Sequence, residues 1–146
     1  QKGKTQLEYN RRYYQEILDV VKTYKDYSIL GHLDVIKRYD LNGEIELEKI
    51  KDLIEQIFEV VIADGKGIEL NTSSHAYHLK SLMPSREILE LYHDMGGKII
   101  TIGSDAHNAD RVGDRVMESQ KILKEIGFDG IYTFDQMKPK FHEFKF

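Results

Sequence analysis

Carboxylate and imidazole side chains occur together where two buried segments of the sequence end. Asp105 and His107 follow the β-branched segment 98–103, and His32 closes the apolar segment 27–32. Residues i and i+2 that leave a strand can both turn toward one crevice, where a carboxylate oxygen and an imidazole nitrogen suit zinc, manganese or iron. An aspartate can also simply cap the following turn, but a cap needs no histidine two residues later. The spacing of Asp105 and His107 therefore indicates a metal site.

His32 is the third candidate metal ligand. A single histidine at a strand end is more often a hydrogen-bonded structural residue, but a neighbouring strand of the same sheet would bring Asp105 and His107 close to it. Asp34 could orient a histidine ring as a hydrogen-bond acceptor or cap a short turn, and the sequence leaves both roles open. Arg38 would suit recognition of a phosphate by paired donors, although an arginine in such a position is commonly a solvated surface residue.

Polar side chains also occur around the strand-like segment 67–71. Glu69 and Asn71 lie in this segment, and the loop after it contains four further polar candidates: Ser73, Ser74, His75 and His78. The four loop residues could face the same crevice, although a surface position is more common for each of them. His93 near a helix end and His142 in a polar tail are assigned no function.

Hydrophobic periodicity predicts the elements that position these residues. Thr5 and Glu8 have the spacing of a capping box, and apolar residues recur at helical spacing behind them. The predicted helices span about 5–25, 47–61, 84–96 and 110–125, and the predicted strands span 27–32, 67–71, 98–103 and 130–134. Helices that alternate with strands in this order imply right-handed crossovers and a parallel sheet. The predicted fold class is therefore α/β.

The composition narrows the possible function classes. The chain has 146 residues, enough for one domain, and a formal net charge of -4, which offers no overall basic field for nucleic acid. It has no cysteine, which excludes disulfides, thiolate zinc sites and a cysteine nucleophile. No stretch reaches the roughly 18 apolar residues of a membrane helix, and no secretory apolar region follows the start. We therefore expect a cytoplasmic protein that binds neither nucleic acid nor membrane.

Four predicted strands are too few for a closed barrel. An eight-stranded barrel needs roughly 200–250 residues, so the chain is either a small open sheet or part of a barrel. The first predicted helix has no strand before it, and the chain starts at Gln1 rather than at an initiator methionine. Both features favour part of a barrel.

Four segments carry a resemblance to a known family. They are 31–39 (GHLDVIKRY), 69–73 (ELNTS), 83–85 (MPS) and 101–107 (TIGSDAH). Together they resemble the carboxyl-terminal half of the histidinol-phosphatase branch of the PHP (polymerase and histidinol phosphatase) family, over about residues 5–140. The last segment is specific to the family as a whole, and the first two are typical of the branch.

The resemblance implies a distorted seven-stranded (β/α) barrel with a trinuclear centre of divalent zinc, iron or manganese. It implies that His32 ligates one metal, Asp105 a second and His107 a third. It also implies that Asp105 and His107 act in catalysis and that Arg38 holds the substrate phosphate. The implied reaction is hydrolysis of L-histidinol phosphate to L-histidinol and phosphate in histidine biosynthesis, by a metal-activated water that attacks phosphorus in line.

Several of the family's metal ligands are absent from this sequence: the amino-terminal His-x-His motif, the other histidine ligands and the bridging glutamate. We therefore expect residues 1–146 to be a single PHP-type domain fragment, roughly the carboxyl-terminal half of the barrel, with little or no phosphatase activity alone. Half a barrel would expose strand edges and an apolar face, which predicts self-association. The loop after Ser74 also lacks an arginine that some relatives carry, so the phosphate contacts there are expected to differ.

Two other functions are open at this point. The complete protein could hydrolyse another small phosphate ester or a nucleotide with the same metal centre. Alternatively, the chain is a non-catalytic α/β module in which Asp105 caps a loop and the histidines are structural. Stoichiometric transition metal that is lost on His107→Ala would support catalysis, and an absence of metal at any loading would support the module.

Overall fold

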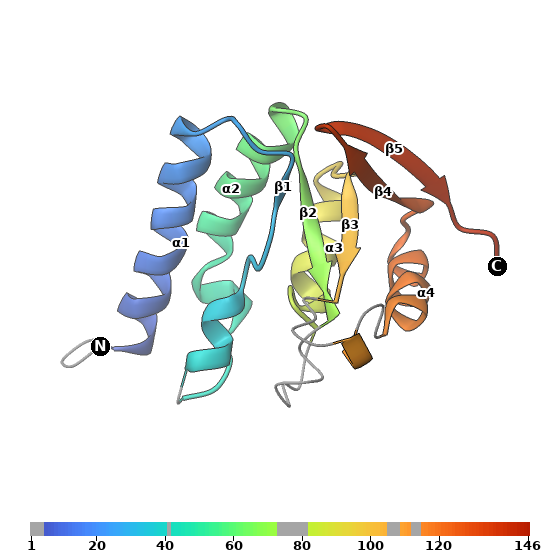
Figure 1. The fold of residues 1–146 in the computed structure, drawn as a ribbon. Coiled ribbons are helices and arrows are strands. Elements are labelled where there is room, and N and C mark those ends of the chain that lie inside the picture. Colours follow the sequence, from blue (N-terminus) through green and yellow to red (C-terminus); the bar gives the residue numbers. More distant parts are fainter. Residues whose placement is uncertain (1–4, 41, 73–81, 105–108, 112–114) are drawn as a thin grey trace.

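A computed structural model describes residues 5–40, 42–72, 82–104, 109–111 and 115–146. In chain order the elements are α1 (Gln6–Thr23), β1 (Ile29–Leu30), the 3-10 helices η1 (Val35–Tyr39) and η2 (Leu47–Lys49), α2 (Lys51–Ala63), β2 (Gly67–Asn71), α3 (Arg86–Asp94), β3 (Ile100–Gly103), the 3-10 helix η4 (Ala109–Arg111), α4 (Val116–Ile126), β4 (Gly130–Asp135) and β5 (Lys138–Glu143). Helices and strands alternate along most of the chain, as the periodicity predicts (Figure 1). Within the described ranges, no helix is both long enough and apolar enough to cross a membrane.

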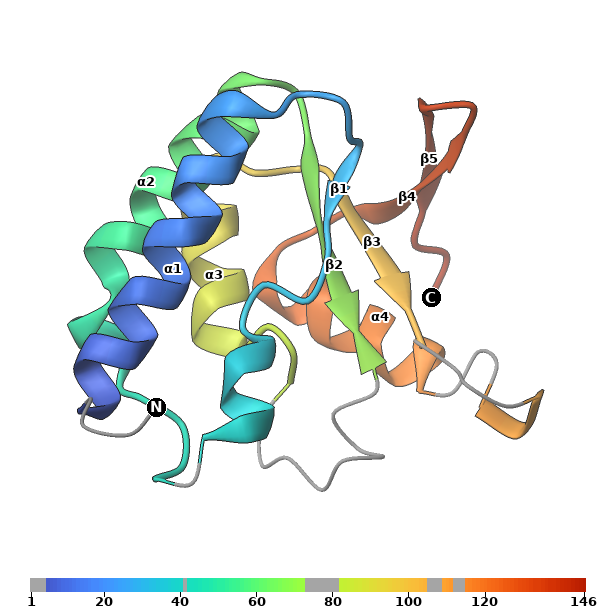
Figure 2. The same cartoon turned by 60° about the vertical axis from the view of Figure 1, so that its left-hand side comes forward.

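Three strands form a parallel sheet in the order β1-β2-β3. β2 pairs with β3 from Ile68 opposite Ile100 to Asn71 opposite Gly103, whereas β1 pairs with β2 only through Ile29 and Leu30. Helices α1, α2 and α3 lie on one side of this sheet (Figure 2). The predicted α/β class and the parallel arrangement of these three strands are confirmed.

The hydrophobic core lies between the sheet and the helices on that side. Ile68, Leu70 and Ile100 are each 0% exposed and belong to one cluster with apolar side chains of α1, α2 and α3. Side chains alternate between the two faces along a strand, so Glu69 and Asn71 point to the face opposite the core. The apolar positions of β2 thus decide which of its polar side chains are available to a site.

Capping residues mark the starts of two helices. Thr5 Oγ1 accepts a hydrogen bond from the backbone N–H of Glu8 at 3.1 Å, as the predicted capping box requires. Ser85 Oγ accepts from the backbone N–H of Ile88 at 3.4 Å, so α3 begins after Ser85 rather than at Pro84. Each cap satisfies an amide that lacks a partner within its own helix.

Two predicted elements are shorter in the structure than in the prediction. The helix predicted over 110–125 begins only at Val116, because Arg115 before it has a left-handed φ of 60°. The strand predicted over 27–32 is reduced to Ile29–Leu30, because His32 has a φ of 51° and turns the chain away from the sheet. Backbone conformation, rather than hydrophobicity, sets both boundaries.

β4 does not join the parallel sheet, so the prediction of a fourth parallel strand is wrong. It pairs antiparallel with β5 in a separate two-stranded sheet, from Gly130 opposite Glu143 to Asp135 opposite Lys138. The connecting residues Gln136 and Met137 have φ values of 50° and 63°, the signs that a type I′ hairpin turn requires. Asn-Gly is the usual sequence for such a turn, so Gln-Met provides no signal for the hairpin.

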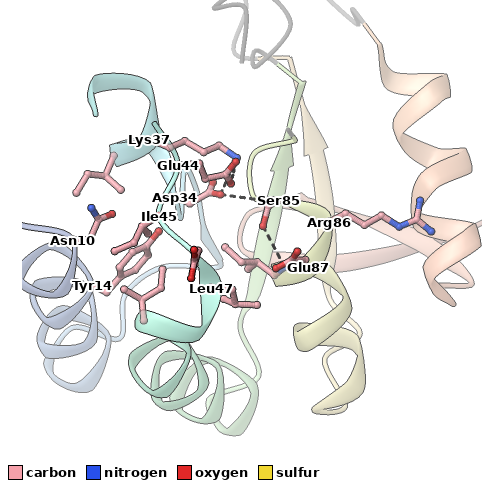
Figure 3. A pocket seen from close by; sticks show the side chains of 14 residues that line it. Asn10, Tyr14, Asp34, Lys37, Glu44, Ile45, Leu47, Ser85, Arg86 and Glu87 are labelled. Carbon is pink, nitrogen blue, oxygen red and sulfur yellow. Dashed lines mark hydrogen bonds and ion pairs between the residues drawn. The ribbon is translucent and has the colours of Figure 1, made fainter. Parts of the chain in front are cut away.

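A buried ion pair joins the segment after β1 to the start of α3 (Figure 3). Lys37 Nζ lies 2.9 Å from Asp34 Oδ2, with side chains only 5% and 3% exposed. The same carboxylate oxygen accepts a hydrogen bond from the backbone N–H of Ser85 at 3.1 Å. Lys37 Nζ also donates to the backbone oxygen of Leu82. The Asp34–Lys37 pair therefore fixes the segment after β1 against the segment that leads into α3.

Lys37 is the main group that offsets the burial of Asp34. Burial raises the pKa of Asp34 above its ordinary value, and the Lys37 charge and hydrogen bond oppose that rise. Glu44 Oε1 lies 3.5 Å from Lys37 Nζ and adds a second, more exposed carboxylate. A cavity of about 320 Å³ lies beside these groups, and its described lining includes Asp34, Lys37 and Glu44 but neither Glu69 nor Asn71 (Figure 3).

Lys37→Met removes the cation and leaves the Asp34 carboxylate buried without it. We expect the free energy of unfolding at pH 7 to fall by about 3–5 kcal/mol, measured by urea denaturation. Lys51→Met is the matched control, because Lys51 is a half-exposed member of a surface pair with Glu55, and the expected loss is below about 1 kcal/mol. A Lys37→Met variant no less stable than Lys51→Met would show that the Asp34–Lys37 pair does not hold the two segments together.

Candidate functional site

Three polar side chains form a hydrogen-bonded chain at the carboxyl edge of β1 and β2. Asn71 Nδ2 lies 3.1 Å from Glu69 Oε1, to which it donates, and 3.2 Å from His32 Nδ1. Asn71 is only 1% exposed, so its amide is a buried link between the other two side chains. We call this set the His32–Asn71–Glu69 chain. It holds a carboxylate and an imidazole at the edge where ligands bind in parallel α/β folds.

Gly103 on the neighbouring strand β3 makes room for the Glu69 carboxylate, and Gly31 lies within ordinary contact distance of it. A Cβ atom at Gly103 would lie 2.6 Å from Glu69 Oε2, and a Cβ atom at Gly31 would lie 3.6 Å from Oε1. Gly103 pairs with Asn71 in the register of β2 and β3, and Gly31 directly follows β1. The carboxylate therefore lies against the sheet, between its two outer strands, where a larger residue at 103 would displace it.

A tyrosine of α1 holds the backbone that carries His32. Tyr13 Oη donates to the backbone oxygens of His32 and Leu33, at 3.3 Å and 3.0 Å. Burial raises the pKa of the Tyr13 phenol well above its ordinary value, and the negative charge of Asp34 adds to the rise. The phenol consequently stays protonated and remains a donor. α1 therefore stabilises the left-handed turn at His32, a conformation that is strained for a non-glycine residue.

The structure places two of the sequence-predicted residues just beyond His32. Among the described residues, the Asp34 side chain accepts from Lys37 and from Ser85 N–H, and it does not cap η1. Arg38 is half-buried on η1, and its role in phosphate binding stays a prediction.

Several predicted residues lie outside the described part of the chain. They are the metal-ligand and catalytic candidates Asp105 and His107 and the loop candidates Ser73, Ser74, His75 and His78. β3 ends at Gly103, beside Asn71 in the parallel register, so the chain reaches Ser104 at the same edge of the sheet as the His32–Asn71–Glu69 chain. The convergence of His32 with Asp105 and His107 stays a prediction.

The donor types at this edge fit a divalent transition metal. The His32–Asn71–Glu69 chain contains an imidazole and a carboxylate, which such metals accept as ligands. Among the described residues, no group of three or more histidine, cysteine, aspartate and glutamate side chains could hold an ion. A complete site would need ligands in addition to these.

The sequence puts Glu69 and Asn71 at a strand end but carries no signal for a role of either residue. Their alternation with Ile68 and Leu70 is the signal that puts both on the face away from the core. The link from Asn71 to His32 could not be read from the sequence, because the two residues are 39 positions apart and meet only through sheet pairing. Tyr13 carries no signal either, since it lies within an ordinary amphipathic helix.

Known proteins resemble this chain over most of its length. A probable histidinol-phosphatase of Thermotoga maritima is 34% identical over 119 residues, covering 82% of this chain and 49% of that protein. The histidinol-phosphatase of Lactococcus lactis is 29% identical over 137 residues, covering 92% of this chain and 51% of that protein. The chain thus spans about half the length of the curated relatives it matches.

A solved structure resembles the fold closely. It is the crystal structure of histidinol phosphate phosphatase from Lactococcus lactis, in complex with zinc, L-histidinol and phosphate. The TM-score is 0.79 at 26% sequence identity, and the match covers 95% of this chain and 53% of that protein. The family model of the PHP domain matches residues 1–73, which is half of the chain. The chain therefore belongs to the PHP-domain family.

Proposed function

We propose that this chain provides part of the active site of a metal-dependent phosphomonoesterase that hydrolyses L-histidinol phosphate to L-histidinol and phosphate, as in histidine biosynthesis. The observation that carries the proposal is the His32–Asn71–Glu69 chain, which presents metal-ligand types at the carboxyl edge of a parallel sheet. The similarity to histidinol-phosphatases, including one solved with zinc, L-histidinol and phosphate, supports this substrate.

The proposed metal ligands of this chain are His32, Asp105 and His107, the last two also acting in catalysis. Zinc is favoured by the Lactococcus lactis complex, and iron and manganese accept the same donor types. When bound, the metal supplies a Lewis acid that polarises the phosphate ester and activates water. A trinuclear centre needs more ligands than these three, so we propose that residues 1–146 act as one unit with the other half of a seven-stranded barrel.

The other residues of the edge bind or position groups. The Arg38 guanidinium is proposed to donate paired hydrogen bonds to the substrate phosphate, a geometry that suits its planar fork. Asn71 orients the ring of His32, and Tyr13 holds the backbone that carries it. The Asp34–Lys37 pair keeps the segment before Arg38 in place against the start of α3.

His107→Ala tests the proposal in the complete barrel protein. We expect tightly held zinc to decrease and kcat/KM for L-histidinol phosphate to fall by about 100-fold or more, because a metal ligand is lost. Zinc content is measured by mass spectrometry after dialysis, and phosphate release gives the rates. His142→Ala is the matched control, since His142 lies on β5 in the separate hairpin and contacts Thr133.

Unchanged zinc content and activity in His107→Ala would contradict the assignment of this ligand. If kcat/KM were higher for another small phosphate ester or for a nucleotide than for L-histidinol phosphate, that compound would be assigned as the substrate instead. A complete protein that holds no metal at any loading would instead support a non-catalytic module.

We propose that the chain on its own has little activity and self-associates. β1 has a paired strand on only one side among the described strands, and large apolar side chains such as Val20, Tyr24 and Met117 are more than half exposed. Sedimentation velocity is expected to show an average mass that rises with concentration. A monodisperse species at the 17.1 kDa of the monomer over the whole concentration range would contradict self-association.

A further inference from the structure

The Glu69 carboxylate has binding capacity that its described contacts do not use. Its hydrogen bond from Asn71 occupies Oε1 at 3.1 Å. No lysine, arginine or histidine of the described ranges forms an ion pair with it, although carboxylates elsewhere, such as Asp52 with Arg11 and Asp34 with Lys37, do have such partners. A half-buried carboxylate accepts several hydrogen bonds or one cation in addition to a single amide donor.

The surroundings of Glu69 hold this carboxylate in place. The residues next to the carboxylate on either side are glycines, Gly31 after β1 and Gly103 at the end of β3. The carboxylate therefore lies over the sheet between these two positions. Asn71, which is 1% exposed, restrains it from the third side. A carboxylate that is restrained by a hydrogen bond and by its neighbours has fewer conformations to lose, so binding a cation there costs less ordering entropy.

We propose that Glu69 is a cation-binding residue of the site and takes the positively charged group of the bound ligand. Two sources share this chemistry: a divalent metal ion and the ammonium group of an amino-alcohol phosphate. That Glu69 belongs to a ligand site rests on the proposed function. Cation binding by Glu69 is nevertheless measured separately, because the measurement needs no hydrolysis of a substrate.

The direct test is a titration of the complete barrel protein labelled with carboxyl-13C glutamate. The Glu69 side-chain resonance is identified by its disappearance in Glu69→Gln, and zinc alone and L-histidinol alone are the two probes. A saturable shift with zinc assigns the site to metal, and a saturable shift with L-histidinol but not with zinc assigns it to the ammonium. Each probe is added from 10-fold the protein concentration up to millimolar levels. If this resonance does not shift with either probe, the proposal is overturned.

Glu69→Gln also measures what the charge contributes, because glutamine keeps the acceptor for Asn71 and removes only the negative charge. The apparent affinity for the probe that shifts the resonance is expected to fall by about tenfold or more in calorimetry. Glu90→Gln is the matched control, since Glu90 is a half-exposed partner of Arg86 on α3. Equal affinities for the wild-type chain and for Glu69→Gln overturn the proposal.

The two glycines provide a second test that leaves Glu69 itself intact. Neither has a φ in the left-handed region, so alanine fits the backbone at both positions. Gly103→Ala places a Cβ atom 2.6 Å from Glu69 Oε2 and pushes this flexible carboxylate aside, whereas Gly31→Ala makes an ordinary contact at 3.6 Å. We expect Gly103→Ala to weaken the same probe about as much as Glu69→Gln, and Gly31→Ala to leave it within about twofold.

The double variant Gly103→Ala/Glu69→Gln separates this effect from a general disturbance of the strand end. If Gly103→Ala acts through Glu69, adding it to Glu69→Gln, which already lacks the negative charge, lowers the affinity for the probe no further. An equally large loss in the Glu69→Gln background would show that Gly103→Ala acts elsewhere and would overturn the role of Gly103. A complete protein that hydrolyses no phosphate ester, but whose Glu69 resonance still shifts with zinc, would refute the proposed function and leave cation binding by Glu69 standing.

Discussion

The register of the three parallel strands decides which side chains meet at the carboxyl edge of the sheet. Ile68 and Leu70 must face the helices to be buried, and this requirement turns Glu69 and Asn71 to the opposite face. A slip of one residue would bury both polar side chains in the core and expose the two aliphatic ones. Pairing of β2 with β1 then brings Asn71 to His32, across 39 positions of sequence. The polar edge is therefore a consequence of how the apolar residues pack.

Polar groups near this edge are held by specific partners rather than by the core alone. Tyr13 fixes the backbone at His32, and Asn71 links the His32 ring to Glu69. The Asp34–Lys37 pair restrains the segment after β1 against the segment leading into α3. These hydrogen bonds and this ion pair are directional and at least partly buried, so they fix the orientation of polar groups, which hydrophobic packing alone does not do. Such fixed geometry is what a metal or phosphate site needs.

Much of the fold could be predicted because its signals are local. The start of α1 follows from the Thr5 cap, and β2 has the predicted bounds, with Ile68 and Leu70 alternating with the polar residues Glu69 and Asn71. The hairpin of β4 and β5 could not be predicted, because its turn uses Gln136 and Met137 in left-handed conformations that neither residue prefers. The shortening of β1 has a similar cause in the positive φ of His32.

The candidate site was only partly accessible to sequence reasoning. A histidine after an apolar, strand-like segment is a visible signal that makes His32 a candidate, and its role as a metal ligand stays a prediction. The contact of His32 with Asn71 has no such signal, because side-chain hydrogen bonds between strands depend on register. For Asp34 the sequence leaves two roles open, orienting a histidine ring or capping a turn. Its described partners are Lys37 and the backbone N–H of Ser85 at the start of α3, and neither contact has a signal in the sequence.

Anomalous diffraction from a zinc-soaked crystal of the complete protein tests the central claim most directly. The account predicts zinc within roughly 2.0–2.1 Å of a ring nitrogen of His32, in a centre that also contains Asp105 and His107. Zinc bound only at positions away from His32, with the His32 ring remote from Asp105 and His107, would contradict the claim that the ends of β1 and β3 build one metal site.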